Sequence, residues 1–149
     1  ISTLLAHGPA WRAAVERMAD EVAAFGPQLL AGIESRGFVF AGPVAARLGL
    51  GFVMIRKKGK LPGAVVSHAY DLEYGSDTLQ VAEGLIEKGT RVVLIDDLIA
   101  TGGTARASIQ LLRQVGADPV GASFLIELVG LGGAERLGVP ASPLMRFPA

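Results

Sequence analysis

The chain has 149 residues, 50% of them hydrophobic, and its 14 lysine and arginine residues balance its 14 aspartate and glutamate residues. We therefore expect a single domain over residues 1–149 with a sizeable core. The zero net charge argues against nucleic-acid binding, which usually needs a basic face. No apolar run reaches the length of a membrane span. The chain has no cysteine, which excludes disulfides and is consistent with a cytoplasmic location.

Helices and strands are predicted to alternate along the chain, which indicates an α/β fold with a mostly parallel sheet. Residues 9–25 carry an apolar stripe at helical spacing, with Pro9 suited to the first turn and Gly26 to the C-terminal cap. Further strands are predicted at 28–33, 51–55, 92–95 and 119–127, with an edge strand at 142–147 and a β-excursion at 65–81. Further helices are predicted at 38–48 and 104–115, with a short helix or turn at 83–88 and a helical segment at 131–137. Pro43 should lie in the first turn of the 38–48 helix or at a kink.

The stretch 92–105, VVLIDDLIATGGTA, is the centre of the functional prediction. Its first four residues are apolar on both faces, as in a central parallel strand. A Thr101-Gly102-Gly103-Thr104 turn then leads into a helix, whose N-terminus leaves backbone N–H groups free for an anion. Glycines let a phosphate approach the backbone, and threonine hydroxyls can donate hydrogen bonds to it.

Asp96 and Asp97 are predicted to lie where this strand ends, at the sheet edge that binds ligands in open α/β folds. In isolation such a pair more often caps a turn or faces solvent. Two acids beside an anion site favour a sugar phosphate, because carboxylates accept hydrogen bonds from ribose hydroxyls. We therefore predict that the turn binds a phosphate and that the acids bind its sugar.

Three more segments carry charged groups in turns. The Glu34-Ser35-Arg36-Gly37 turn follows a predicted strand, and so does the lysine-rich segment 56–63, RKKGKLPG. Segment 70–75, YDLEYG, lies in the β-excursion. Taken alone, each is more often a solvated loop or an ordinary hairpin than a binding site.

Together these segments resemble the type I phosphoribosyltransferases. An apolar strand, two acids, a short link and a T-G-G-T loop form the family's motif for phosphoribosyl pyrophosphate, and all are present in 92–105. Segments 56–63 and 70–75 narrow the resemblance to members that act on adenine. The resemblance implies a mostly parallel central sheet flanked by helices, with a flexible β-hairpin loop at about residues 62–80.

The resemblance also implies a reaction and a set of site residues. The reaction is transfer of the 5-phosphoribosyl group from phosphoribosyl pyrophosphate to adenine, giving AMP and pyrophosphate. The resemblance implies that Glu73 and Tyr74 act in catalysis from a closing loop. It implies that the phosphoribosyl group is bound by Asp96, Asp97, Ala100, Thr101, Gly102, Gly103 and Thr104. It implies that pyrophosphate is bound by Glu34, Ser35, Arg36, Gly37 and Lys60, with a cis peptide between Glu34 and Ser35. Leu98, directly after the acids, would form an apolar floor beneath the purine.

The remaining expectations concern cofactor, partners and base. The resemblance implies Mg²⁺ bound mainly by pyrophosphate and ribose oxygens, with no dedicated protein ligands, and a homodimer. Family members usually carry an N-terminal hood over the adenine, and the opening Ile1-Ser2-Thr3-Leu4-Leu5 resembles only its end. We therefore expect an incomplete hood and weak recognition of adenine by these 149 residues. Two alternatives stay open: a phosphoribosyltransferase for another base, such as xanthine or orotate, and a non-catalytic regulator that binds the phosphoribosyl donor.

Overall fold

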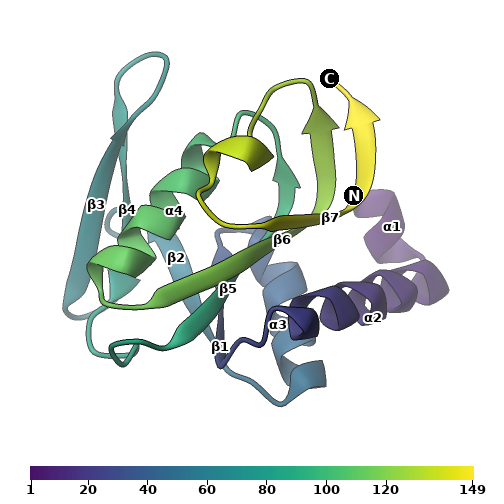
Figure 1. Cartoon of the computed structure of the whole chain (residues 1–149), viewed down its shortest axis with the longest axis horizontal. Coiled ribbons are helices and arrows are strands. Elements are labelled where there is room, and N and C mark those ends of the chain that lie inside the picture. Colours follow the sequence, from purple (N-terminus) through teal and green to yellow (C-terminus); the bar gives the residue numbers. More distant parts are fainter.

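The computed structural model describes all residues from Ile1 to Ala149 and shows one sheet with helices on both faces (Figure 1). The strands are β1 (Leu29–Ile33), β2 (Phe52–Lys57), β3 (Val65–Asp71), β4 (Ser76–Ala82), β5 (Arg91–Ile99), β6 (Asp118–Val129) and β7 (Ala141–Pro148). The helices are α1 (Ser2–Ala6), α2 (Gly8–Ala24), α3 (Arg36–Leu48), α4 (Gly103–Gln114) and the 3₁₀ turn η1 (Ala134–Arg136).

The sheet has the strand order β3-β4-β2-β1-β5-β6-β7. Strands β2, β1, β5, β6 and β7 are parallel, and the hairpin β3–β4 joins β2 in antiparallel orientation. The chain runs from β1 through α3 to β2 on one side, and from β5 through α4 to β6 on the other. Strand order therefore reverses between β1 and β5, and such a switch point opens a crevice at the carboxyl ends of the two strands.

Two apolar cores cover the two faces of the sheet. Residues alternate along β5, so that Val92 and Leu94 belong to the core beneath α4, whereas Val93 and Ile95 belong to the core beneath α2 and α3. The helices accordingly lie on opposite sides of the sheet (Figure 1). None of them combines the length and the apolar composition that a membrane span requires.

Strand β5 extends beyond the end of its neighbour β1. Their parallel pairing ends at Gly32 and Ile95, whereas β5 stays paired with β6 as far as Ile99. Asp96 and Asp97 were predicted to follow the strand, but they lie within it. The physical reason is that the long strand β6 continues to supply hydrogen bonds after β1 has turned away toward α3.

The structure confirms the alternation of helices and strands and the β-hairpin predicted at 65–81. Residues 83–88 form turns, and the helical segment at 131–137 shrinks to the short η1. Helix α3 begins at Arg36, two residues earlier than predicted, and Pro43 lies well inside it and not in its first turn. The N-terminal α1 was not predicted.

The close approach of α3 to β1 gives a stability prediction. A Cβ atom added at Gly32 would lie 2.8 Å from the Ala41 Cβ, so Gly32→Ala must push the helix away from the strand. We expect a loss of about 1–3 kcal/mol in the free energy of unfolding, measured by urea denaturation.

The matched control is Gly42→Ala in the same helix, where the nearest atom to an added Cβ is 3.8 Å away in the Phe52 ring. This variant should lose much less stability than Gly32→Ala, because the usual gain of about 0.5–1 kcal/mol for alanine over glycine in a helix offsets crowding against the ring of the following Pro43. Equal unfolding midpoints for Gly32→Ala and the unsubstituted chain would contradict the prediction.

Candidate active site

A cavity of about 600 Å³ lies at the switch point between β1 and β5. Its walls come from the end of β1, from the end of β5, from the turn into α4 and from two lysines. The lining residues are Ile33, Glu34, Ser35, Arg36, Lys57, Lys60, Asp96, Asp97, Leu98, Ile99, Ala100, Thr101, Gly102, Gly103, Thr104 and Ala105. The structure thus brings together three segments that are far apart in the sequence.

Two helix N-termini converge on this cavity. Ser35 is the N-cap of α3 and Gly102 is the N-cap of α4, and neither helix has a side-chain cap hydrogen bond. Their first backbone N–H groups are therefore left for a ligand, and both helix dipoles favour an anion at this position. The Glu34–Ser35 peptide is cis, as the resemblance implied.

The phosphate-binding turn is braced by a loop that the sequence did not indicate. Gly102 has a φ of +84°, and an added Cβ would meet the Gly133 backbone at 2.7 Å. Conversely, a Cβ on Gly133 would lie 2.3 Å from the carbonyl oxygen of Ala100. Gly103 has nothing within 4 Å of such an atom. Gly102 is thus required by backbone geometry and packing, whereas Gly103 leaves space at the turn.

The two acids differ in their surroundings. The side chain of Asp97 is only 6% exposed and forms an ion pair with Arg36, which is 67% exposed. Hydrogen bonding to Asp97 raises the pKa of Arg36 above its usual value. Burial, together with the neighbouring Asp97 carboxylate, raises the pKa of Asp96 to about 8. The raised pKa favours the protonated form of Asp96 near neutral pH, whereas the Asp97 carboxylate is paired with the Arg36 guanidinium.

Glu34 organises the cations on the opposite wall. Its side chain is 9% exposed, accepts a hydrogen bond from Lys60 at 2.8 Å and also accepts one from the backbone N–H of Lys57. Burial alone would raise the pKa of Glu34, but these hydrogen bonds outweigh burial and lower it. Because its carboxylate is occupied by cations, any binding of pyrophosphate by Glu34 must come from its backbone.

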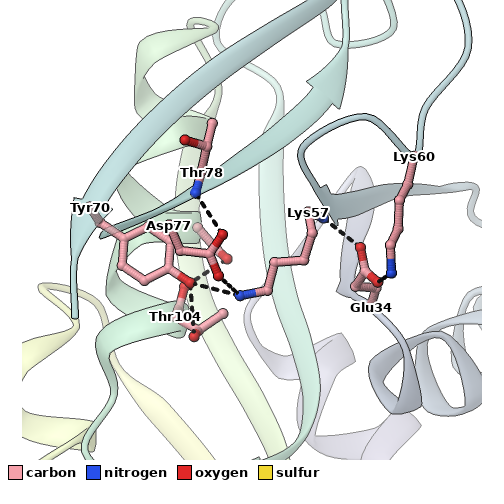
Figure 2. Close-up of polar contacts among 8 residues, drawn as sticks. Glu34, Lys57, Lys60, Tyr70, Asp77, Thr78 and Thr104 are labelled. Atoms are coloured by element: carbon pink, nitrogen blue, oxygen red, sulfur yellow. Dashed lines mark hydrogen bonds and ion pairs between the residues drawn. The ribbon is translucent and has the colours of Figure 1, made fainter. Parts of the chain in front are cut away.

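Lys57 was not among the predicted site residues, although its segment was. Figure 2 shows its ammonium group between the hairpin and the turn into α4, paired with Asp77. The same group donates to the Tyr70 hydroxyl at 3.2 Å, and that hydroxyl lies 3.3 Å from Thr104 Oγ1. Burial would lower the pKa of Lys57, but the hydrogen bonds to Asp77 and Tyr70 raise it.

Three predicted residues do not line the cavity. Glu73 and Tyr74 lie in the exposed connection between β3 and β4, and Tyr74 is 87% exposed. Gly37 packs against β5, where an added Cβ would lie 3.0 Å from Asp96 Oδ1. Gly37 therefore allows α3 to approach the acid pair, and Glu73 and Tyr74 can reach a ligand only if the hairpin moves.

Comparison with known proteins gives the class to which this chain belongs. The model of the phosphoribosyl transferase domain family matches residues 2–135. An adenine phosphoribosyltransferase from Rhodospirillum centenum is 56% identical over 147 residues, which cover 99% of this chain and 86% of that protein.

Solved structures agree with this assignment. The adenine phosphoribosyltransferase from Thermoanaerobacter pseudethanolicus superposes with a TM-score of 0.95 at 40% identity, covering 99% of this chain and 86% of that one. The Saccharomyces cerevisiae enzyme, in complex with adenine and an imino-altritol bisphosphate, has a TM-score of 0.88 at 35% identity, covering 95% of this chain and 83% of that one. The chain therefore belongs to the phosphoribosyltransferase family, and within it to the adenine phosphoribosyltransferases. The predicted type I phosphoribosyltransferase fold is confirmed.

The raised pKa of Asp96 gives a prediction of pH-dependent stability. Its folded value of about 8 lies above the ordinary 3.8, so the folded chain keeps a proton that the unfolded chain releases. The contribution of Asp96 to stability is complete below pH 3.8 and is lost as the pH rises toward 8. Asp96→Asn cannot ionise, so its melting temperature relative to the unsubstituted chain should rise by several degrees between pH 5 and pH 8.

The measurement is a pair of thermal melts at each pH, and the difference between the two proteins removes the contribution of other titrating groups. Asp118→Asn, which removes an exposed acid at the start of β6, is the control and should show a constant difference. A constant difference for Asp96→Asn as well would mean that Asp96 ionises normally.

Proposed function

We propose that this chain transfers the 5-phosphoribosyl group of phosphoribosyl pyrophosphate to adenine, giving AMP and pyrophosphate, a reaction of purine salvage. The observation that carries the proposal is the convergence of two free helix N-termini on a cavity that also contains a pair of acids. The helix ends suit two separate anionic groups, and the acids suit the sugar between them. Relatives that share about half of the sequence are adenine phosphoribosyltransferases.

The 5′-phosphate is assigned to the turn from Thr101 to Thr104, and the ribose to the acid pair. As the bond from ribose C1 to pyrophosphate breaks, positive charge develops on the ring. The charged Asp97 is held in place by Arg36, so it can stabilise that charge without reorganising. The protonated Asp96 can donate a hydrogen bond to a sugar or phosphate oxygen.

Pyrophosphate is assigned to the start of α3, to Arg36 and to Lys60. Arg36 uses its Nε to hold Asp97, and Lys60 uses one ammonium hydrogen to hold Glu34. Guanidinium and ammonium groups have further donors, so both cations can bind the leaving group while staying anchored. This arrangement orients positive charge toward the pyrophosphate before it departs.

The cofactor, assembly and location are also part of the proposal. No three His, Cys, Asp or Glu side chains are grouped as a metal site, but the Asp97 carboxylate lines the cavity and provides an oxygen donor of the kind that Mg²⁺ prefers. We propose Mg²⁺ bound mainly through the substrate, since this ion favours phosphate and water oxygens over a protein cage. Bound there, it would neutralise charge on the pyrophosphate. A homodimer and a cytoplasmic location are proposed from the family resemblance and the absence of cysteine.

The base is assigned to the space beside Leu98, with the hairpin closing over it. Leu98 is half-buried at the cavity wall, and the Saccharomyces cerevisiae relative binds adenine. Closure would bring Glu73 to the purine, where its carboxyl group could accept a proton from a ring nitrogen or donate one to it. Tyr74 would help to exclude water from the closed site. The tip residues 72–75 are exposed, so closure would uncover little buried surface.

Turnover with a panel of bases tests the proposal. With phosphoribosyl pyrophosphate and Mg²⁺, we expect adenine to be turned over to AMP and pyrophosphate faster than guanine, hypoxanthine, xanthine or orotate, with a high KM for adenine if the base is recognised weakly. Asp97→Asn, purified in the same way, controls for contaminating activity because it lacks the charge beside the ribose. Faster turnover of another base would overturn the choice of adenine, and donor binding without turnover would identify a regulator.

A second experiment tests the role of the hairpin tip. Glu73→Gln should slow the single-turnover rate by about 10²–10⁴-fold, the usual worth of general acid–base catalysis, with donor affinity nearly unchanged. Glu83→Gln removes the same charge at the other end of the hairpin, where residue 83 is exposed, and should leave the rate unchanged. Weak donor binding by Glu73→Gln with a normal rate would make Glu73 a binding residue.

A further inference from the structure

The hydrogen-bond chain in Figure 2 begins at the Lys57 ammonium group, whose direction of donation is fixed. Lys57 Nζ lies 3.2 Å from the Tyr70 hydroxyl oxygen, and an ammonium group can only donate. Tyr70 therefore accepts from Lys57, which leaves its own hydrogen available to a second acceptor. Thr104 Oγ1, at 3.3 Å, is the one other group in hydrogen-bonding contact with this hydroxyl.

This direction decides what Thr104 can do. A threonine hydroxyl has one hydrogen to donate. If its oxygen accepts from Tyr70, that hydrogen is directed away from the hairpin, and Thr104 lines the cavity at the phosphate-binding turn. We propose that Tyr70 is a positioning residue for phosphoribosyl binding, which holds the Thr104 hydroxyl as a donor to the 5′-phosphate. The inference rests on the proposed function and adds to it a residue outside the cavity wall.

Charge and packing keep the chain in this arrangement. Asp77 forms an ion pair with Lys57 and also accepts from the backbone N–H of Thr78 at 2.8 Å. Asp77 is the cross-strand neighbour of Tyr70, so the two residues hold the ammonium together (Figure 2). The Tyr70 ring packs on the core beneath α4, and the Lys57 ammonium lies 5.8 Å from its centroid. Tyr70 is therefore fixed by its ring as well as by its hydroxyl.

The hairpin is attached to α4 at a second place, which makes a matched control available. His68 Nε2 lies 2.9 Å from Gln110 Oε1, and the Gln114 amide donates to the Ser67 carbonyl at 3.1 Å. These contacts join the same two elements as the pair of Tyr70 and Thr104. They do not reach the phosphate-binding turn, so breaking them loosens the hairpin without changing the Thr104 hydroxyl.

The test is the affinity for ribose 5-phosphate, measured by calorimetry, since this probe has neither a base nor a pyrophosphate. Tyr70→Phe keeps the ring and should bind it about five- to tenfold more weakly, the scale of one hydrogen bond. The same change in a Thr104→Val background should have no further effect, because no hydroxyl remains to be oriented. In a Thr104→Ser background the effect should return.

Kinetics provide a second readout that a general structural defect would not reproduce. Tyr70→Phe should raise the KM for phosphoribosyl pyrophosphate and leave the kcat and the KM for adenine nearly unchanged. The control Gln110→Leu should bind ribose 5-phosphate with unaltered affinity. The proposal would be overturned if Tyr70→Phe bound ribose 5-phosphate with wild-type affinity. It would also be overturned if Tyr70→Phe weakened that affinity by the same factor with Thr104 present as with Thr104→Val.

Failure of this inference is separable from failure of the proposed function. If the wild-type chain forms AMP while Tyr70→Phe binds ribose 5-phosphate normally, the positioning role is wrong and the reaction stands. If the predicted pattern of affinities is found but no base is turned over, the positioning role stands and the reaction is wrong.

Discussion

The unequal lengths of β1 and β5 are the constraint on which the rest of the site depends. Pairing between them stops at Gly32 and Ile95, whereas β5 continues to Ile99 on the support of β6. The chain leaving β1 must therefore turn into α3 beside an unpaired edge of β5, and Gly37 allows the helix to approach it. Both helix N-termini and the acid pair share this small space because one strand is longer than its neighbour.

Charge is distributed across this space as pairs and not as a single-signed patch. Asp97 binds Arg36, Glu34 binds Lys60, and Asp77 binds Lys57. Each acid is less exposed than its cationic partner, so the buried carboxylates are compensated while the cations keep donors for a ligand. The more exposed member of each pair is thus a cation with donors to spare, which suits a polyanionic substrate with a sugar between its phosphates.

The hairpin and the phosphate-binding turn are mechanically connected through α4. His68 on β3 contacts Gln110 and Gln114 in the C-terminal part of that helix. Tyr70 on the same strand contacts Thr104 in its first turn. The paired strands of the hairpin are thereby fixed relative to the Thr101–Thr104 turn, and the tip with Glu73 extends free of the cavity. Such a division suits a loop that must close over a base without disturbing the group that anchors the substrate.

Several parts of the site could be predicted because their signals are local. The apolar run at 92–95, the Thr101–Thr104 turn and the 65–81 hairpin are each contained in one short stretch, where periodicity and turn chemistry act between neighbours. The end of β5 was misplaced because its length depends on β6, more than twenty residues further along the chain. The role of Gly133 was missed for the same reason, since its constraint is the distant Ala100 carbonyl.

The sequence by itself thus determined the α/β class, the Thr101–Thr104 turn before a helix, the acid pair that precedes it and the family. Only the tertiary structure decided that Asp97 is paired with Arg36, 61 residues away, and that burial raises the pKa of its neighbour Asp96. It also decided that Lys57 and Tyr70 belong with Thr104, 34 residues beyond Tyr70. The physical reason is that burial, pairing and the direction of a hydrogen bond are properties of groups brought together by folding, and sequence spacing does not encode them.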